Sequence, residues 1–180
     1  AGLGATALRA AAVREMHTDR PDATESPFTV EAGRFQLEMD AGSFTRIRLD
    51  GVRTTEWSVM PFNVRYGLAS DLEAGILFAP HIHTAEQGRD APKRTRQGVG
   101  DTIVRAKMNL AGNDGGAPAF GVMADVKLPT AADGLGNGRV EGAFRFPVAF
   151  GLGGGWEGGA MSSLEWVHTG SARRMVWANT

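Results

Sequence analysis

Two histidines separated by one residue are the first side chains in this sequence whose spacing could hold a metal. His81 and His83 share one face of a predicted strand, near its end. Zinc would need a third and a fourth ligand, and the chain has no cysteine to supply them. Glu86 and Asp90 lie nearby, but a polar loop explains them equally well. We therefore expect no metal site and no other cofactor.

A serine hydrolase centre would need a serine and a histidine within hydrogen-bond reach. Ser162 and His168 share a face of one predicted strand, but six steps of about 3.3 Å separate them by roughly 20 Å. Ser163 points to the other face, so a partner would have to come from another strand. No phosphate-binding loop or dinucleotide fingerprint precedes a helix. The sequence predicts that the protein is not an enzyme.

Three polar segments have simpler explanations than ligand binding. Residues 112–116 and 133–138 are rich in Asn, Asp and Gly but lack the Asp-x-Asp spacing of a calcium loop, so we expect turns. Residues 93–96, Lys-Arg-Thr-Arg, are the densest basic run. We expect this run in a long, solvated loop. In a membrane barrel that loop would lie outside the cell, where it would meet lipopolysaccharide phosphates or anionic solutes.

The composition limits the class of protein. The chain has 180 residues, 42% of them hydrophobic and 22% charged, which suits one ordinary domain. A net charge of −1 gives no reason to expect nucleic acid as a partner. No segment approaches the roughly 18 apolar residues of a membrane helix, which excludes helical membrane proteins only. The 25 glycines, many inside predicted strands, favour a curved sheet.

After residue 33, apolar and polar residues alternate, as in strands with one apolar and one polar side. Long and short connections alternate for six links, which is typical of an up-and-down barrel. We predict a leader over residues 1–33 and an all-β, antiparallel, up-and-down transmembrane β-barrel over residues 34–180. The leader would hold an export-signal remnant, a short helix or coil. About eight strands are expected, near residues 34–46, 54–68, 72–84, 98–111, 117–129, 138–153, 156–169 and 172–180.

Alternation alone does not say which side of the strands faces water. In a soluble barrel the apolar side points inward, whereas in a transmembrane barrel it meets lipid and the charged side lines the lumen. Aromatic residues near strand ends, among them Tyr66, Phe120 and Trp156, favour the transmembrane barrel, because they match its interface girdles. In that interpretation mixed-sign charges line the lumen: Glu38, Asp40, Arg65, Glu73, Arg105, Lys107, Asp125, Lys127, Glu141 and Arg145.

Four segments carry a resemblance to a known family: TDRPDATESPFTVEAGRFQLE, EWSVMPFNVRYGLASDLEAGI, GVGDTIVRAKMNLAGN and DVKLPTAADGLGNGRVEG. From about residue 18 to its end, the sequence resembles the outer-membrane transporter family named for the meta pathway of phenol degradation. The most specific pieces are the DRPD-TESP leader, the G-x-GD motif at Gly98, Gly100 and Asp101, and KLPTA at 127–131.

The resemblance implies a β-barrel in the outer membrane of a Gram-negative bacterium, in contact with lipid and lipopolysaccharide. It also implies passage of small, often aromatic or apolar solutes. Members of that family have further strands, so these residues would be part of a larger, truncated barrel. No catalytic or ligand-binding residue is implied, and nothing indicates an oligomeric state.

The leader has two expected positions. Pro21 and Pro27 keep it from continuing as helix or joining a ladder. We expect extended coil at the periplasmic mouth, in preference to a position inside the lumen. Inside the lumen, four of its charges would pair with wall charges: Asp19, Arg20, Asp22 and Glu25.

The sequence therefore predicts a barrel through which small solutes pass without chemistry. Two alternatives remain open. One is a non-conducting structural or adhesive barrel, sealed by its own ion pairs. The other is a soluble, lipocalin-like ligand-binding barrel, with the apolar sides of its strands enclosed.

Overall fold

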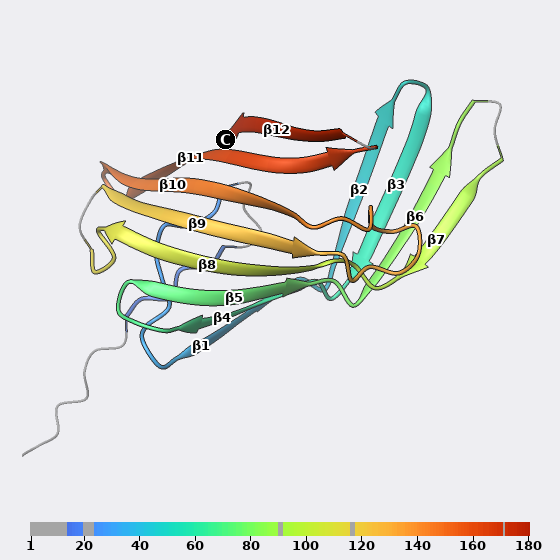
Figure 1. Ribbon diagram of the computed structural model, residues 1–180. Coiled ribbons are helices and arrows are strands. Elements are labelled where there is room, and N and C mark those ends of the chain that lie inside the picture. Colours follow the sequence, from blue (N-terminus) through green and yellow to red (C-terminus); the bar gives the residue numbers. More distant parts are fainter. Residues whose placement is uncertain (1–13, 20–23, 90–91, 116–117, 171) are drawn as a thin grey trace, which may run out of the picture.

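The computed structural model describes residues 14–19, 24–89, 92–115, 118–170 and 172–180 (Figure 1). In these residues all regular structure is β-strand, so no helix is present that is long and apolar enough to cross a membrane. The expected signal remnant or short helix at residues 1–13 lies outside the described residues. The described strands are β1 (Phe35–Met39), β2 (Gly42–Leu49), β3 (Val52–Val59), β4 (Phe62–Gly67), β5 (Leu72–Phe78), β6 (His81–Gln87), β7 (Arg94–Gly98), β8 (Thr102–Ala111), β9 (Ala119–Leu128), β10 (Glu141–Gly153), β11 (Trp156–Thr169) and β12 (Ala172–Asn179).

The strands form two sheets, in which every strand pair is antiparallel. Sheet A has the order β1-β4-β5-β8-β9-β10-β11-β12, and sheet B has the order β2-β3-β6-β7. Sheet B leaves sheet A at a marked angle (Figure 1). The all-β, antiparallel prediction is confirmed. Neither sheet is closed into a barrel by the described residues, because β1 and β12 are the edges of sheet A.

Each of the first four predicted strands contains a bend, which is why twelve strands are described where eight were expected. The predicted strand 34–46, for example, covers β1 and the beginning of β2. Pairing keeps its register through that bend: Met39 pairs with Phe62 on one side, and Gly42 pairs with Val59 on the other. Both paired segments therefore contain the same number of residues between these two pairs, three steps each. Because the pairing keeps its register, neither strand contains an inserted residue that could mark the bend in the sequence.

Prolines and one left-handed residue lie at the bends of two of these predicted strands, 54–68 and 72–84. Pro61 and Pro80 lack the N–H group that an uninterrupted ladder needs. Met60 has a φ of 52°, a conformation that residues other than glycine rarely adopt. Hydrogen bonds still cross the bend, because Asp40 N–H donates to the Pro61 carbonyl at 3.1 Å and Met60 N–H donates to the Ala41 carbonyl at 3.3 Å. The sheet therefore turns without being cut.

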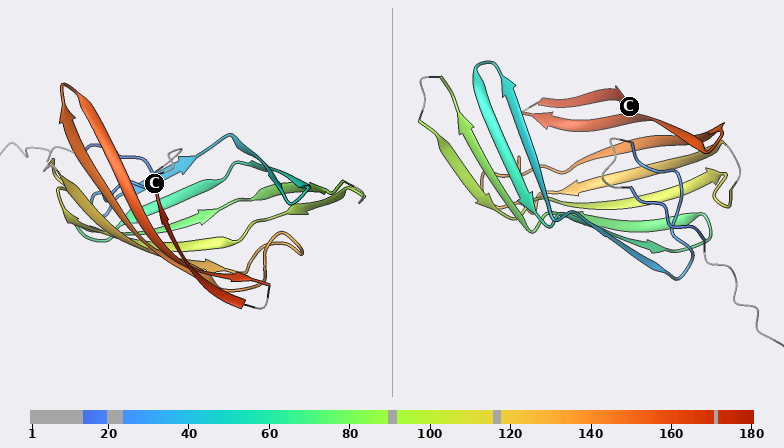
Figure 2. Two further views of the ribbon diagram at one scale, coloured as in Figure 1. Left: turned by 90° about the horizontal axis from the view of Figure 1, so that it is seen from above. Right: turned by 180° about the vertical axis from the view of Figure 1, so that it is seen from behind.

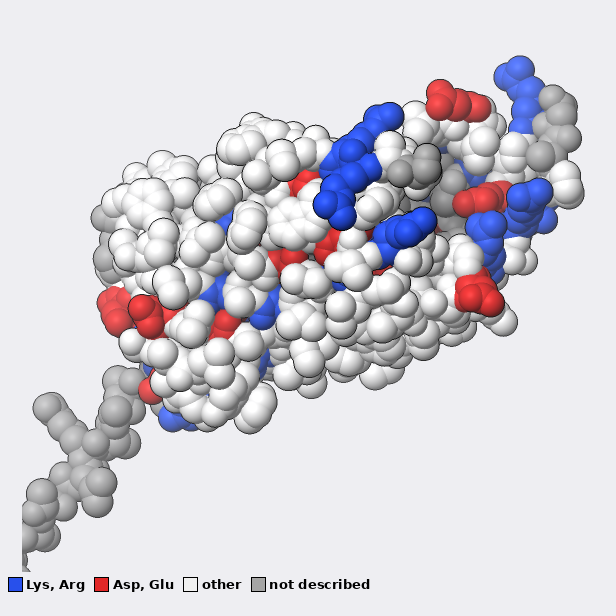
Figure 3. Space-filling model, viewed as in Figure 1, with Lys and Arg blue, Asp and Glu red and all other residues white. Residues whose placement is uncertain are grey.

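Sheet A has a polar face and an apolar face, and the polar face is the buried one. On the polar face Arg65 and Lys107 are 1% and 0% exposed, whereas Phe35 and Leu37 on the apolar face are 74% and 64% exposed. The leader crosses the polar face (Figure 2, right). The opposite side is mainly uncharged over the strands of sheet A (Figure 3). This arrangement is the reverse of a soluble ligand-binding barrel, whose apolar sides would be enclosed.

The basic run at 93–96 does not lie in a long loop, contrary to expectation. Residues Arg94–Gly98 form β7, which pairs with β6 and is an edge strand of sheet B. In β7 the Arg96 Nη1 atom lies 3.5 Å from the Glu86 carboxylate of β6. Edge strands often carry charge on both sides, and without an apolar side such a strand looks like a loop in the sequence.

Candidate functional site

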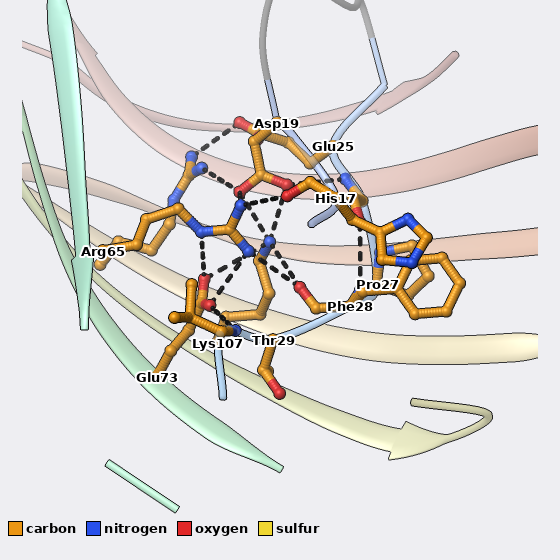
Figure 4. A network of polar contacts seen from close by, with 12 residues as sticks. His17, Asp19, Glu25, Pro27, Phe28, Thr29, Arg65, Glu73 and Lys107 are labelled. Atoms are coloured by element: carbon orange, nitrogen blue, oxygen red, sulfur yellow. Dashed lines mark hydrogen bonds and ion pairs between the residues drawn. The ribbon is translucent and has the colours of Figure 1, made fainter. Parts of the chain in front are cut away.

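Arg65 of β4 is the centre of a buried charge cluster between the polar face of sheet A and the leader (Figure 4). Its guanidinium makes a bidentate pair with Glu73 of β5, with Nε–Oε1 at 2.9 Å and Nη2–Oε2 at 3.0 Å. Nη1 donates to Glu38 of β1 at 2.7 Å. Nη1 also donates to the leader carbonyl of His17, and Nη2 donates to the leader carbonyl of Phe28, each at 2.9 Å. The five N–H donors of arginine suit a position that must satisfy several acceptors at once.

Lys107 of β8 takes its counter-ion from the leader. Its Nζ lies 2.8 and 2.6 Å from the two carboxylate oxygens of Asp19, and 3.5 Å from Glu73 Oε1. Asp19 is 4% exposed, and its own N–H donates to Glu38 Oε2 at 3.0 Å. The leader therefore supplies both a carboxylate and a backbone donor to the polar face of sheet A.

Arg105 of β8 extends the cluster across the sheet. Its Nε and Nη2 lie 2.7 and 2.9 Å from the two carboxylate oxygens of Asp125 in β9, and Nη2 lies 2.8 Å from Glu25 Oε1 in the leader. Arg145 of β10 pairs with Asp125 as well, and its Nη2 lies 3.4 Å from Glu165 Oε1 in β11. Arg105 Nη1 also lies 4.0 Å from Asp19 Oδ2, which joins these residues to the contacts of Arg65 and Lys107. Seven of the predicted wall residues thus belong to one network: Glu38, Arg65, Glu73, Arg105, Lys107, Asp125 and Arg145.

Two other predicted wall residues form a separate group near the bend. The Lys127 Nζ atom lies 2.8 Å from Glu141 Oε2 and 3.1 Å from Asp101 Oδ2. Asp40, the tenth predicted wall residue, lies at the bend between β1 and β2 and is half-buried. No ion pair between described residues joins the Lys127 group to the cluster around Arg65.

The leader lies against the wall charges and not away from them, which corrects the preference for the mouth. Asp19 and Glu25 contact the cluster, while Arg20 and Asp22 lie outside the described residues. Burial explains the position, because the wall cations lose hydration under the leader and need nearby carboxylates to offset that loss.

Backbone contacts also hold the leader against sheet A. Val30 N–H donates to Glu73 Oε2 at 2.7 Å. Gly67 of β4 lies so close to the leader that a Cβ there would stand 2.2 Å from the Glu31 carbonyl oxygen and 2.5 Å from that of Val30. A residue with a side chain could not occupy this position without moving the leader backbone.

A cavity of about 580 Å³ lies beside the cluster. It is bounded by the leader, the first residues of β9 and β11 and the last part of β10. His17, Phe28, Ala149 and Glu157 are among the residues that line it. The rings of His17 and Phe28 stack with centroids 3.9 Å apart. Its volume falls in the range of small-molecule sites, so a solute could be accommodated here without displacing the wall charges.

The histidines and serines considered for chemistry have other partners. The Trp57 ring contacts the rings of His81 and His83, with centroid distances of 5.5 and 5.3 Å. Ser162 Oγ donates to Asn179 Oδ1 at 2.6 Å, and His168 Nδ1 lies 3.9 Å from Glu141 Oε1. Among the described residues no group of three or more His, Cys, Asp or Glu side chains is arranged to hold a metal ion.

Comparison with protein families gives one match to nearly the whole described fold. The model of the family described as "Putative MetA-pathway of phenol degradation" matches residues 18–176. The chain belongs to this phenol-degradation family. Comparisons with curated proteins and with solved structures returned no match.

The segments that most resemble the phenol-degradation family meet at two places in the fold. The DRPD-TESP leader lies on the cluster through Asp19 and Glu25. The G-x-GD and KLPTA motifs contact each other at the bend: Ala131 N–H donates to Asp101 Oδ1 at 2.9 Å, and Ala132 N–H donates to the Val99 carbonyl at 3.0 Å. These motifs of the family therefore hold the leader and the bend in place.

Sequence reasoning missed three polar residues that hold the leader. Asn109 Nδ2 donates to the Pro27 carbonyl at 2.9 Å, and Asn113 Nδ2 donates to Thr29 Oγ1 at 2.7 Å. Arg14 Nη1 donates to the Ser70 carbonyl at 2.9 Å. Asn109 could have been found, because it shares the charged side of its strand with Arg105 and Lys107. Asn113 and Arg14 lie in a turn and in the leader, where no alternation marks a face.

Proposed function

We propose that this chain forms the wall of an outer-membrane β-barrel in a Gram-negative bacterium, and that small solutes cross the membrane through its lumen without chemical change. The observation that carries the proposal is the inverted exposure of sheet A. Charged residues such as Arg65 and Lys107 are buried with the leader, while apolar residues such as Phe35 and Leu37 face outward. An exposed apolar face of this kind is unfavourable in water, whereas contact with lipid makes it stabilising.

Aromatic pairs on the apolar face support the membrane setting. Phe62 and Phe78 lie 5.8 Å apart beside the bend, whereas Phe120 and Phe150 lie toward the other ends of β9 and β10. Aromatic residues at two levels, with aliphatic residues between them, are typical of the two interface girdles of outer-membrane barrels. In this setting the edges β1 and β12 require partners, because lipid cannot satisfy their free backbone groups.

The family description supports a link to the degradation of phenolic compounds. If the chain forms a barrel wall, that link would be the passage of small aromatic or apolar solutes through the lumen. The cavity of about 580 Å³ beside the leader would offer such solutes space within the lumen.

A barrel sealed by its own ion pairs is the second candidate, favoured by the complete burial of Lys107 beneath Asp19. One experiment separates the two. The full-length gene product would be purified from outer-membrane fractions and reconstituted in planar bilayers and in swelling-assay liposomes. Discrete conductance steps and solute-dependent swelling would support passage, whereas a folded, membrane-inserted and electrically silent protein would support the sealed barrel. Recovery of a detergent-free soluble monomer would contradict both.

A further inference from the structure

One face of sheet B carries several cations and no carboxylate. The strand registers place alternate residues of β2, β3, β6 and β7 on this face, together with Lys93 just before β7. We call it the basic face. Its members are Gly42, Phe44, Arg46, Arg48, Arg53, Thr55, Trp57, Val59, His81, His83, Ala85, Gln87, Lys93, Thr95 and Gln97.

The cations of the basic face differ from the buried cations of sheet A in their partners. Arg65, Arg105 and Lys107 have carboxylate partners, whereas no ion pair joins Arg46, Arg53 or Lys93 to a carboxylate of the described residues.

The reverse side of sheet B has the ordinary mixture of signs. Glu56 and Glu86 lie there with Arg94 and Arg96, and Arg96 pairs with Glu86 at 3.5 Å. The excess of positive charge therefore belongs to one face and is not a general property of this sheet.

Neighbouring groups position the cations of the basic face. The Arg53 Nη2 atom donates to Gln87 Oε1 on the adjacent strand at 2.7 Å, and the Arg46 guanidinium carbon lies 5.4 Å from the centroid of the Phe44 ring. The rings of Trp57 and His83 are stacked, with centroids 5.3 Å apart. Arginines held in this way lose less side-chain freedom when they bind an anion.

A cleft of about 310 Å³ brings these groups together. Arg46, Arg53 and Lys93 line it along with Trp57 and His83. A second cleft, of about 370 Å³, shares Arg53 and Gln87 with the first and adds Arg48 and Arg89. The first cleft thus offers three cationic groups and the ring of Trp57, a residue that is 39% exposed.

We propose that the basic face binds small organic carboxylates at the cleft between Arg46, Arg53 and Lys93. The guanidinium groups donate to the carboxylate, and the apolar part of the anion rests on Trp57. That this site collects anions at one end of the lumen for passage rests on the proposed function; the binding itself does not.

Binding is measured with the full-length protein in detergent, by isothermal titration with butyrate. Acetate has the same charge with less apolar surface, and butan-1-ol has a similar body without charge. We expect butyrate to bind most tightly, acetate more weakly and butan-1-ol not at all. The double variant Arg46→Gln/Arg53→Gln should weaken butyrate binding at least about tenfold, since each lost charge-assisted hydrogen bond contributes roughly this factor. Trp57→Ala should weaken butyrate binding and leave acetate binding nearly unchanged.

The matched control is Arg94→Gln/Arg173→Gln, which removes the same charge from exposed positions outside the basic face. Butyrate should bind this control as it binds the wild type. Equal weakening in both double variants would overturn the proposal, because it would show a general charge effect. Failure of the wild type to bind butyrate would overturn it as well.

Reversal potentials in a salt gradient across planar bilayers test the link to passage. The wild type should have an anion-to-cation permeability ratio above one. A ratio that falls toward one in Arg46→Gln/Arg53→Gln, but not in the control variant, would support the link. Binding without conductance would leave the site in place and contradict the proposed passage. Conductance without butyrate binding would contradict the proposed site and leave the proposed passage in place.

Discussion

The Nζ atom of Lys107 lies 2.6 Å from Oδ2 of Asp19, a residue 88 positions earlier in the chain, and both side chains are almost fully buried. A buried lysine is stable as a cation only beside a carboxylate. The leader is therefore part of the charge balance of the polar face, and its removal would take away the closest carboxylate partner of Lys107.

The first prediction concerns this pair. Asp19→Asn should release the leader from the polar face, because the loss of one partner from a buried pair costs about 3–5 kcal/mol. Hydrogen exchange of residues 24–33 should become at least roughly 100-fold faster, since each 1.4 kcal/mol is a factor of ten. The control Asp114→Asn breaks an ion pair with Arg14 whose carboxylate side chain is 77% exposed, so it should change exchange little. Equal protection in Asp19→Asn and the wild type would show that the backbone contacts alone hold the leader.

The second prediction concerns the centre of the cluster. Arg65→Met leaves Glu38 and Glu73 buried without their main partner, and should lower the free energy of unfolding by about 3–5 kcal/mol. Denaturant titration of the protein folded in detergent measures the loss. Arg174→Met, at an exposed position of β12, should change stability by no more than about 0.5 kcal/mol. Similar stabilities for the two variants would refute a central role for Arg65.

The third prediction concerns the close approach at Gly67. Gly67→Ala adds a Cβ 2.2 Å from the Glu31 carbonyl oxygen, so the leader backbone must shift, at a cost of about 1–3 kcal/mol. Protease cleavage between residues 24 and 33 should become faster. Gly151→Ala is the control, because a Cβ there meets no atom within 4 Å. An unchanged cleavage rate in Gly67→Ala would show that the leader lies further from β4 than the structure indicates.

The fourth prediction separates lipid from water as the surroundings of the apolar face. Val104 lies on this face in β8 and is 43% exposed. In a bilayer Val104→Arg should destabilise the folded protein by about 2–4 kcal/mol, whereas an exposed site in water would tolerate it within about 0.5 kcal/mol. Urea titrations in lipid vesicles measure the difference. Leu49→Arg, on the exposed far strand β2, should be tolerated, and equal tolerance at Val104 would exclude the membrane wall.

The fifth prediction concerns the leader as an obstruction. Deletion of residues 14–33 from the full-length protein should increase single-channel conductance, because the polar face of sheet A would then face only water. A synthetic peptide of residues 14–33 should restore the smaller conductance when added in trans. The same peptide with Asn at position 19 should do so at much higher concentration, because it lacks the carboxylate that pairs with Lys107. Unchanged conductance after deletion would show that the leader does not narrow the path.

The sequence predicted the polar face with some accuracy, since alternation fixes which residues of a strand share a side. Arg65 and Glu73 were placed on one side from periodicity, and they form a bidentate pair across β4 and β5. The bends were missed, because Met60 and Pro61 interrupt the ladder without shifting the register. The position of the leader was also missed, since its partners Lys107 and Arg105 lie more than 80 residues away in the chain.

The sequence by itself determined the strands, their two faces and the family of the chain, because each depends on neighbouring residues or on a contiguous motif. Only the tertiary structure decided that the polar face is the buried one and that Asp19 and Glu25 complete its charges. It also decided that four strands turn into a second sheet with a basic face. These features arise from contacts between residues far apart in the chain. Local sequence patterns depend on neighbouring residues and therefore do not predict such contacts.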